Sequence, residues 1–270
     1  MDEAALQIRA SLISQSLPPP SQTWLSNLLS TRPKPLPPLP SLTATAKARL
    51  LAADLTSPGL LDRAGTSPFP PSAADPETRE TCLTRDVVVQ VLDVENLSRS
   101  RWEQVEELEA VARGELTKGR QIIRLREDGA EEDGEGVGDV PPEEGARRQQ
   151  QQQQQQQQAG GGAAARATAG GPAVSDKNAT HKLVVQDCAG NKFFALEVRR
   201  VERLGIGKTN IGEKMLIRAG TVVARGTVLL EPEKCVVLGG RVEAWHKAWL
   251  DGRLARLKEA AGASATEHGH

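Results

Sequence analysis

The sequence of 270 residues has few aromatic side chains and no tyrosine. Three phenylalanines and four tryptophans make up 3% of the chain, and hydrophobic residues account for 38% of it. The missing tyrosines argue against a catalyst that depends on a phenol and against a tyrosine-rich binding surface. The low hydrophobic content excludes a chain that is all core, so we expect one modest folded domain with disordered or loosely attached segments.

Cysteine is also scarce: Cys82, Cys188 and Cys235 lie far apart, and no pair has Cys-X-X-Cys spacing. This pattern argues against a zinc ribbon or a redox pair and predicts three reduced, buried thiols. The N-terminus has no basic segment followed by an apolar one, and no apolar run reaches the length of about 18 residues that a membrane span needs. We therefore expect a cytosolic or nuclear protein. Its net charge of −1 gives no overall field that would attract nucleic acid.

No group of residues has the spacing of a known catalytic or metal site. Residues 205–209 (GIGKT) resemble part of a phosphate-binding loop, but the position that needs the first glycine is Glu202, whose charge would repel phosphate. No pair among the four histidines has the spacing of metal ligands. The sequence therefore predicts no catalytic residue, no cofactor, no metal and no enzyme.

The first 60 residues have the pattern of three short helices. Residues 2–17 form the first, which is amphipathic, and Ser21 is the predicted N-cap of the second. A third helix is expected to begin near Ser41 or Thr43. The proline-rich stretch 32–40 between the second and third helices has polyproline II character, and a stiff spacer is favoured there over an SH3 ligand.

The next segment mixes loop, strand and helix. Residues 62–81 are predicted to be loop, and residues 86–94, which are rich in valine, a strand. Ser98 is predicted to cap a charged helix over residues 100–113, and residues 119–126 form a second extended piece. Four apolar side chains are expected on one face of that helix: Trp102, Val105, Leu108 and Val111.

Residues 127–180 differ sharply in composition from both flanks. Nine acidic residues and no basic one lie between Glu127 and Glu144, ten glutamines follow at 149–158, and then comes a Gly/Ala-rich tract. Such a segment cannot bury enough apolar surface to offset its chain entropy, so we predict that it is disordered. The glutamine run is interpreted as a tolerated expansion in a loop rather than an active element.

Short strands separated by glycine-containing turns dominate the rest of the chain. They are predicted at residues 182–187, 191–198, 213–218, 221–230 and 235–238, and an amphipathic helix follows at 242–260. Together with the strand at 86–94 this makes five to six strands, which suits a small β-barrel of the OB-fold type. The acidic and glutamine-rich segment is then an insertion between the first two barrel strands.

Two stretches carry a resemblance to a known family. Residues 182–198 (KLVVQDCAGNKFFALEV) and 211–245 (IGEKMLIRAGTVVARGTVLLEPEKCVVLGGRVEAW) are similar to the OB-fold of the RecQ-mediated genome instability protein 1 family. The most specific run is 226–244, in which Cys235 replaces a residue that is usually polar. The segment 118–124 resembles fungal members, and the N-terminal helices resemble the family's small helical domain, although the proline-rich joint is less typical.

The resemblance implies a non-catalytic nuclear protein that binds a type IA topoisomerase III and a RecQ-family helicase. In the family, this trio dissolves double Holliday junctions to non-crossover products and so serves DNA replication, homologous recombination, DNA repair and genome stability. The family's OB-fold binds protein more than DNA, and its insertion, here after Arg126 and before Lys182, reaches the topoisomerase gate. No second OB-fold, which larger animal members carry, is expected in this chain.

The resulting organisation is an α+β chain. Its expected parts are an N-terminal helical domain (1–60), a loop (61–81), the first OB strand with the following helix and strand (82–126), the insertion (127–180), the remaining OB-fold with the C-terminal helix (181–260) and a tail (261–270).

The charge distribution suits a protein partner. Residues 181–260 contain 15 Lys and Arg against nine Asp and Glu, an excess of +6, whereas the insertion begins with an acidic stretch. Base stacking would need exposed aromatic rings, and of the adjacent Phe193 and Phe194 one must point inward. Partner contacts are predicted at Lys214, Arg218 and Arg225 on barrel strands and at Arg124, Arg126, Glu127 and Asp128 at the edges of the insertion.

Alternatives remain open at this stage. Each of these residues could be an ordinary solvated charge, and the acidic run could simply keep the insertion in water. The whole chain could instead be a free-standing OB-fold protein that binds single-stranded DNA, or an adaptor that recruits partners through its glutamine and proline tracts. In the favoured interpretation, DNA is contacted weakly or through the complex, and neither a membrane nor a small-molecule substrate is involved.

Overall fold

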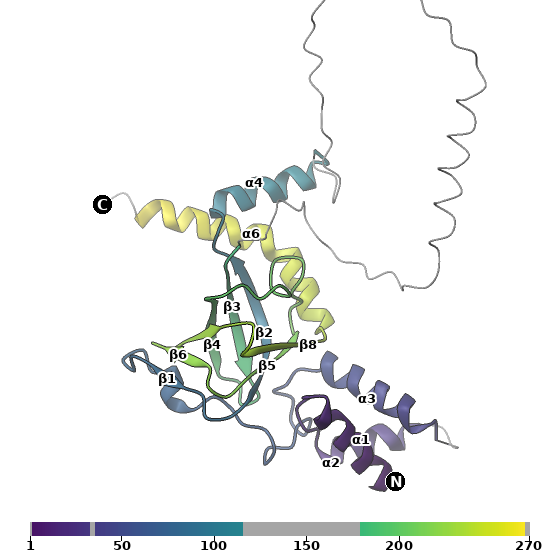
Figure 1. Cartoon of the computed structure of the whole chain (residues 1–270). Coiled ribbons are helices and arrows are strands. Elements are labelled where there is room, and N and C mark those ends of the chain that lie inside the picture. The colour runs from purple at the N-terminus through teal and green to yellow at the C-terminus, as the bar shows by residue number, and fades with distance from the viewer. Residues whose placement is uncertain (1, 33–35, 116–178, 268–270) are drawn as a thin grey trace, which may run out of the picture. The chain divides into compact units, whose positions relative to one another are not determined.

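The computed structural model of the chain describes residues 2–32, 36–115 and 179–267, which fall within one compact unit. Three helices come first, then a sheet of short strands interrupted by one helix, and a long helix comes last (Figure 1). This order confirms the predicted class of an α+β chain with an N-terminal helical part, an OB-fold and a C-terminal helix. In the described part of the chain, no helix combines the length and apolarity needed to cross a membrane.

The N-terminal part consists of α1 (Asp2–Ser14), α2 (Gln22–Ser30) and α3 (Leu39–Ala52). Ser21 caps α2 as predicted, because its Oγ accepts a hydrogen bond of 3.1 Å from the backbone N–H of Trp24. α3 begins earlier than the predicted Ser41 or Thr43. A proline lies in its first turn, where a backbone N–H has no intrahelical partner and proline is therefore tolerated.

Aliphatic side chains hold these three helices together. Ile8, Leu12, Leu25 and Leu50 are fully buried, and they come from all three helices. Burying one such side chain stabilises a fold by about 1.5–3 kcal/mol. The helical part therefore has a hydrophobic core of its own.

Eight strand segments form the sheet in the described part of the chain. They are β1 (Thr81–Cys82), β2 (Val87–Asn96), β3 (His181–Asp187), β4 (Lys192–Glu197), β5 (Lys214–Ile217), β6 (Val222–Ala224), β7 (Thr227–Leu230) and β8 (Cys235–Gly239). The sequence predicts five to six strands. The number differs because β1 is very short and because Arg225 and Gly226, both with positive φ, turn the chain between β6 and β7.

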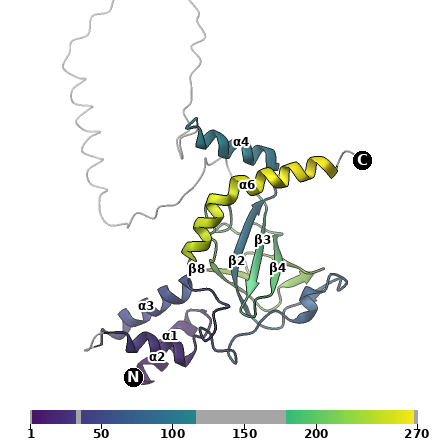
Figure 2. The same ribbon diagram turned by 180° about the vertical axis from the view of Figure 1, so that it is seen from behind.

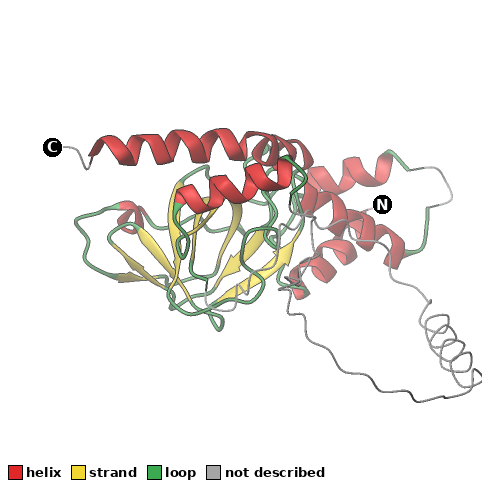
Figure 3. Cartoon of the chain, turned by 90° about the horizontal axis from the view of Figure 1, so that it is seen from above, coloured by secondary structure: helices red, strands yellow, loops and turns green. Residues whose placement is uncertain are grey.

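The order of strands across the sheet is β1-β6-β7-β4-β3-β2-β5-β8. β5 leads into β6 and β7 leads into β8 along the chain, yet the members of each pair lie far apart in this order. The sheet must therefore curl back on itself, as it does in Figures 1 and 3. β4 and β7 run parallel, whereas the other pairs are antiparallel, and the arrangement is that of an OB-fold.

β2 and β3 are neighbours in the sheet although residues 97–180 separate them in the chain. The register runs from Val89 opposite Asp187 to Asn96 opposite His181, with a bulge near Val91. The intervening segment therefore lies between the first two long strands of the barrel, as the sequence predicts. Most of the predicted insertion, and the predicted extended piece at 119–126, lie outside the described residues.

Residues 62–81 are not all loop, which corrects the prediction. They contain the short 3-10 helix η1 (Pro71–Ala74) and the beginning of β1. Phe69 is buried, and its ring centroid lies 4.3 Å from that of Phe193. A two-residue edge strand is too short to produce an alternating pattern, so the sequence could not indicate it.

β3 and β4 alternate between buried and exposed residues, as expected for strands with one face on a core. The adjacent phenylalanines confirm the prediction that one of them points inward. Phe193 is buried in the barrel core, whereas Phe194 is 54% exposed on the outer face.

The helix after β2 is α4 (Arg101–Ala112), and its cap is Ser100 rather than the predicted Ser98. The Ser100 Oγ accepts a hydrogen bond of 3.1 Å from the N–H of Glu103, and the Glu103 carboxylate accepts one of 2.8 Å from the N–H of Ser100. The sequence predicts Trp102 on the buried face of this helix, and this prediction is wrong: its side chain is 57% exposed. Gln104 is buried there instead, because its amide donates hydrogen bonds to the backbone carbonyl oxygens of Asn96, at the end of β2, and of Arg99.

The C-terminal helix is α6 (Glu243–Glu267), which extends beyond the predicted range of 242–260 and runs beside α4 (Figure 2). Trp249 anchors it in the barrel core, and the Trp249 Nε1–H donates a hydrogen bond of 2.6 Å to the Asp93 carboxylate. Arg253 and Arg256 lie near the face of the same indole ring. α6 is therefore fixed to β2 through one aromatic side chain.

The three cysteines are free, but they are not all buried as predicted. Cys82 is exposed, Cys188 is partly exposed and only Cys235 is buried. Cys82 lies on the two-residue edge strand, whose place in the fold the sequence does not reveal.

Candidate functional site

Hydrogen bonds join the residues just after β2 to the residue just before β3. The backbone N–H of Leu97 donates a hydrogen bond of 2.9 Å to the carbonyl oxygen of Thr180, and the N–H of Thr180 donates one of 2.8 Å to the Ser98 Oγ. Two large apolar side chains are exposed in the same segment, Leu97 at 46% and Trp102 at 57%. This region, which we call the insertion base (residues 97–102 and 180), is a candidate surface for a partner.

Two ion pairs hold α4 in place, one to α6 and one to the insertion base. Lys258 of α6 forms an ion pair of 2.5 Å with Glu109 of α4, and Arg99 forms one of 2.6 Å with Glu107. The hydrogen bond that Lys258 donates, together with the charges of Lys258 and Arg113, lowers the pKa of the Glu109 carboxyl. The helix that leads into the insertion is thus tied both to the loop before it and to α6.

A buried polar cluster lies where the chain returns into β3. His181 Nδ1 is 2.7 Å from Glu197 Oε2, and Arg200 donates a hydrogen bond of 2.8 Å to Glu197 Oε1. Burial acts to raise the pKa of Glu197, but hydrogen bonds from His181 and from the Val201 N–H, together with the charge of Arg200, bring this pKa below its usual value. The sequence did not reveal this cluster, because His181 and Glu197 lie on different strands, 16 residues apart in the chain, and polar residues usually lie outside a barrel.

This cluster has the residue types of an acid–base site but not the access. His181 is fully buried and Glu197 is 5% exposed, so neither can reach a substrate in this conformation. No group of three or more His, Cys, Asp or Glu residues able to hold a metal occurs among the described residues. The cluster fastens the start of β3 to the end of β4.

Lys214 is not a surface residue, which corrects the prediction of a partner contact there. Its side chain is fully buried, and its Nζ donates a hydrogen bond of 2.7 Å to the carbonyl oxygen of Gly212. Burial lowers the pKa of Lys214 to about 8, although the nearby Asp54 carboxylate acts to raise it. β5 is buried on both faces because Leu55, from the segment after α3, packs on its outer side.

The other two barrel residues are exposed but do not lie on strands. Arg218 follows the end of β5, and Arg225 lies in the turn between β6 and β7. The structure does not bring these two residues together with the insertion base. The predicted contacts Arg124, Arg126, Glu127 and Asp128 lie outside the described residues.

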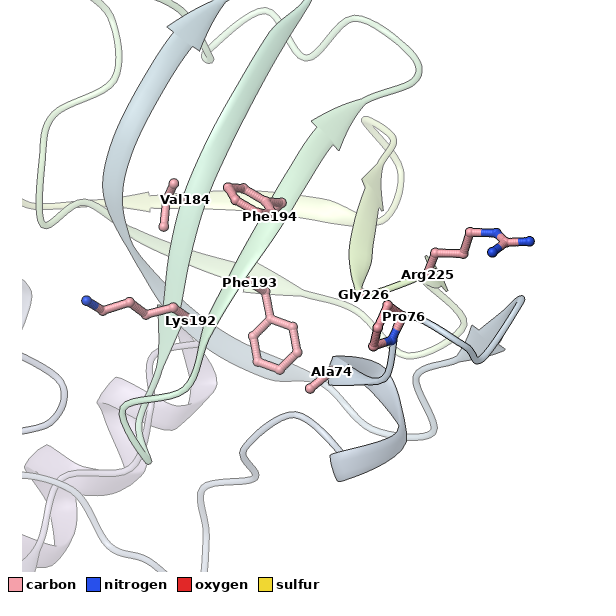
Figure 4. Close-up of a pocket in the computed structure, with 8 residues that line it drawn as sticks. All are labelled: Ala74, Pro76, Val184, Lys192, Phe193, Phe194, Arg225 and Gly226. Carbon is pink, nitrogen blue, oxygen red and sulfur yellow. The ribbon is translucent and has the colours of Figure 1, made fainter. Parts of the chain in front are cut away.

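A pocket of about 280 Å³ opens beside the outer face of β3 and β4. Figure 4 shows the exposed ring of Phe194 on β4, with Lys192 and Arg225 extending on opposite sides. Val184 lies directly opposite Phe194 in the strand register. The pocket is lined by Ala74, Pro76, Val184, Lys192, Phe193, Phe194, Arg225 and Gly226.

Comparison with known proteins identifies two family matches. Residues 69–253 match the family described as "RMI1, N-terminal OB-fold domain", and residues 12–58 match "RMI1, N-terminal helical domain". A relative from Schizosaccharomyces pombe, named "RecQ-mediated genome instability protein 1", is 32% identical over 73 residues. These residues cover 27% of this chain and 30% of the relative.

The first match spans the curled sheet, the insertion and the beginning of α6, and the second spans most of the helical part. Both agree with the elements described above, and the first alone covers more than half of the chain. The chain therefore belongs to the RMI1 family of RecQ-mediated genome instability proteins.

Proposed function

We propose that this chain is a non-catalytic subunit of a RecQ-associated complex that maintains genome stability. Its direct partner in this proposal is a type IA topoisomerase III, and a RecQ-family helicase completes the complex in the nucleus. The observation that carries the proposal is the family match over residues 69–253, which covers the OB-fold.

The insertion base is the surface that we assign to the topoisomerase. Trp102 is the most exposed of the large apolar side chains in the described residues, and tryptophan is strongly enriched among residues that dominate binding energy. Leu97 adds a second exposed apolar group in the loop that leads to the same helix. The long chain segment that leaves after α4 and returns at Thr180 would then extend the contact beyond the barrel.

In this role the chain positions the topoisomerase and takes no part in the chemical step. A subunit that holds a topoisomerase in a productive state needs a rigid frame where the chain leaves β2 and re-enters at β3, and it needs no reactive group. The ion pairs of α4 and the hydrogen bonds at Thr180 supply that frame. In this proposal, the complex converts double Holliday junctions to non-crossover products, and the insertion modulates the passage of one strand through the other.

Capture of a purified type IA topoisomerase III by the immobilised chain tests the proposal. In one variant, residues 127–178 are replaced by a Gly-Ser segment of equal length, which keeps the loop closed without its native side chains. We expect this variant and Trp102→Ala to capture less topoisomerase than the intact chain. Leu6→Ala, which truncates an exposed apolar side chain of α1, is the matched control and should capture as much as the intact chain.

The glutamine run is the second control. Deleting residues 149–158 should leave capture unchanged, because we assign this run no contact. Failure of the intact chain to capture the topoisomerase would contradict the proposed partner. Equal capture by the intact chain and the Gly-Ser variant would contradict a contact through the insertion.

A further inference from the structure

A smaller pocket, of about 170 Å³, opens where β2, α4 and α6 meet. β2 contributes Asp93 and Glu95 to its wall, and the neighbouring helices α4 and α6, which run side by side in Figure 2, contribute most of the rest. Three arginines line it, Arg101 of α4 and Arg253 and Arg256 of α6. We call this site the arginine pocket; of its three arginines, only Arg101 also belongs to the insertion base.

The two acidic side chains of the arginine pocket already have partners. The Asp93 carboxylate accepts the hydrogen bond from the Trp249 Nε1–H. Glu95 forms an ion pair of 2.7 Å with Lys182 and a longer one of 3.3 Å with Arg101. Burial acts to raise the pKa of Glu95, but the hydrogen bonds and charges of Lys182 and Arg101 bring it below its usual value. Neither carboxylate forms an ion pair with the two arginines of α6.

Arg253 is a half-buried cation without a counter-ion. Its guanidinium lies 5.6 Å from the centroid of the Trp249 ring, and no acidic side chain in the described part of the chain forms an ion pair with it. Burial, and to a lesser extent the charge of Arg256, lowers the pKa of Arg253, although the charge of Glu107 acts to raise it. A partly desolvated charge interacts more strongly with an opposite charge than one in water does, so an anion in this pocket would be bound firmly.

Arg256 is folded back toward the same indole ring. Its Nη2 donates a hydrogen bond of 2.7 Å to the carbonyl oxygen of Trp249, and its guanidinium lies 5.8 Å from the ring centroid. Gly252 leaves the space for this arrangement, because a Cβ at that position would lie 2.6 Å from the Arg256 Nη1. Glycine within a helix is less favourable than alanine. The glycine at this position is therefore explained by the placement of the arginine and not by the stability of α6.

We propose that the arginine pocket binds a phosphorylated serine or threonine side chain of a protein partner. A phosphate group carries a charge of about −1.5 to −2 at pH 7 and has three strong acceptor oxygens, which matches Arg253 and Arg256 with Arg101 as a third donor. A carboxylate has one charge and would leave one of these arginines uncompensated. The pocket is smaller than the volume of about 300 Å³ at which sites for small molecules begin, so it fits the head group of a side chain.

The surroundings of the pocket fit an extended polyanion less well. Nucleic acid is held by a groove whose cations follow its backbone. Here α4, which forms one side of the pocket, carries four glutamates, Glu103, Glu106, Glu107 and Glu109. A strand of nucleic acid that passed over the pocket along α4 would meet this row of negative charge, whereas a single phosphorylated side chain need not lie along it.

Retention of the full chain on bead-bound peptides tests the pocket. The peptides are short and random apart from a central phosphoserine, serine or glutamate. We expect the phosphoserine beads to retain about tenfold more of the chain than the serine beads. Arg253→Gln should remove most of this difference, and Arg253→Lys should keep only part of it, because lysine cannot bind two oxygens as a fork. Lys247→Gln is the matched control, since it removes an exposed charge of α6 outside the pocket, and it should be retained like the intact chain.

Gly252→Ala separates binding from folding. The added Cβ would displace the Arg256 guanidinium, which is the flexible end of a long side chain, and would leave the backbone of α6 in place. We expect this variant to have an unchanged or higher melting temperature and yet to be retained about tenfold less on the phosphoserine beads. A merely structural role of Gly252 would not lower retention without lowering the melting temperature.

Several results would overturn this proposal. Equal retention on phosphoserine and serine beads would do so, as would an equal loss in Arg253→Gln and Lys247→Gln. Equal retention on phosphoserine and glutamate beads would assign the pocket to an ordinary acidic partner, and binding of oligo-dT that is lost in Arg253→Gln would assign it to nucleic acid. Topoisomerase capture by the intact chain is measured separately, so this proposal can fail while the proposed function stands.

Discussion

The side-chain amide of Gln90 on β2 donates a hydrogen bond of 2.7 Å to the carboxylate of Asp54, which lies just after α3. The Gln90 Oε1 accepts a hydrogen bond of 3.0 Å from the backbone N–H of Leu55, and its Nε2 also donates one of 3.0 Å to Gln186 on β3. One buried side chain thus joins the segment after the helical part to two strands of the barrel. Gln90 is fully buried, and its hydrogen bond from the N–H of Leu55 is buried as well, so water cannot replace that bond.

Replacing Gln90 by leucine should therefore destabilise the chain. The substitution keeps a similar volume but leaves the N–H of Leu55 and one oxygen of Asp54 without this partner. A buried polar group that loses its hydrogen bond costs about 1–3 kcal/mol. Urea unfolding of Gln90→Leu should show a loss in this range. Gln7→Leu, on the exposed side of α1, is the control and should change stability little; equal stability of both variants would contradict the role of Gln90.

Two adjacent glycines provide a matched pair for a second prediction. Gly239 and Gly240 both have positive φ, but a Cβ at Gly240 would overlap the backbone of Leu51 in α3, whereas a Cβ at Gly239 would meet nothing. Backbone strain should lower the free energy of unfolding of Gly239→Ala by about 1 kcal/mol, and that of Gly240→Ala should fall clearly more because its Cβ also overlaps α3. Thermal unfolding of both variants measures the difference. Equal melting temperatures would show that α3 does not press against this turn.

Lys214 should make stability depend on pH in an unusual direction. Its pKa is about 8 in the folded chain and 10.5 in its ordinary state, so the unfolded chain binds more protons between these values. Stability should therefore rise as the pH increases through this window, and below it the cost of burying the charge is fully present. Lys214→Met should remove this rise, which amounts to at most about 3 kcal/mol. Urea unfolding of both proteins from about pH 7 to about pH 10.5 measures it; parallel pH profiles would contradict a buried charge.

The three thiols should differ in reactivity. Burial raises the pKa of Cys235 to about 12, so it has almost no thiolate at neutral pH, whereas Cys82 is exposed. Iodoacetamide should modify Cys82 first in the native chain and Cys235 only after unfolding. Mass spectrometry of peptides from timed reactions gives the order. Early modification of Cys235 would mean that β8 opens readily.

Much of this fold could be predicted from local patterns. The cap at Ser21, the hairpin of β3 and β4 and the opposite orientations of Phe193 and Phe194 follow from turn residues and from the two-residue period of strands. Ser98 and Ser100 are both of a residue type that can cap the N-terminus of α4. Only the backbone geometry after β2 selects Ser100.

Features that depend on distant contacts could not be predicted. Lys214 looks like an exposed charge at the start of a strand, but the segment after α3 covers that side of β5. The spacing of Trp102 in the sequence is that of a residue on the buried face of α4. In the structure the side chain of Gln104 occupies that face, because its amide forms hydrogen bonds there. The pocket beside Phe194 combines β3, β4, η1 and the β6–β7 turn, which no sequence window contains.

Dissolution of a synthetic double Holliday junction is the most direct test of the central claim, that this chain is a subunit acting with a topoisomerase and a helicase. The assay contains a purified type IA topoisomerase III and a RecQ-family helicase, with this chain absent, intact, or carrying the Gly-Ser segment at residues 127–178. We expect the intact chain to raise the yield of non-crossover product and the Gly-Ser variant to raise it less. The same yield with and without the intact chain would contradict the claim.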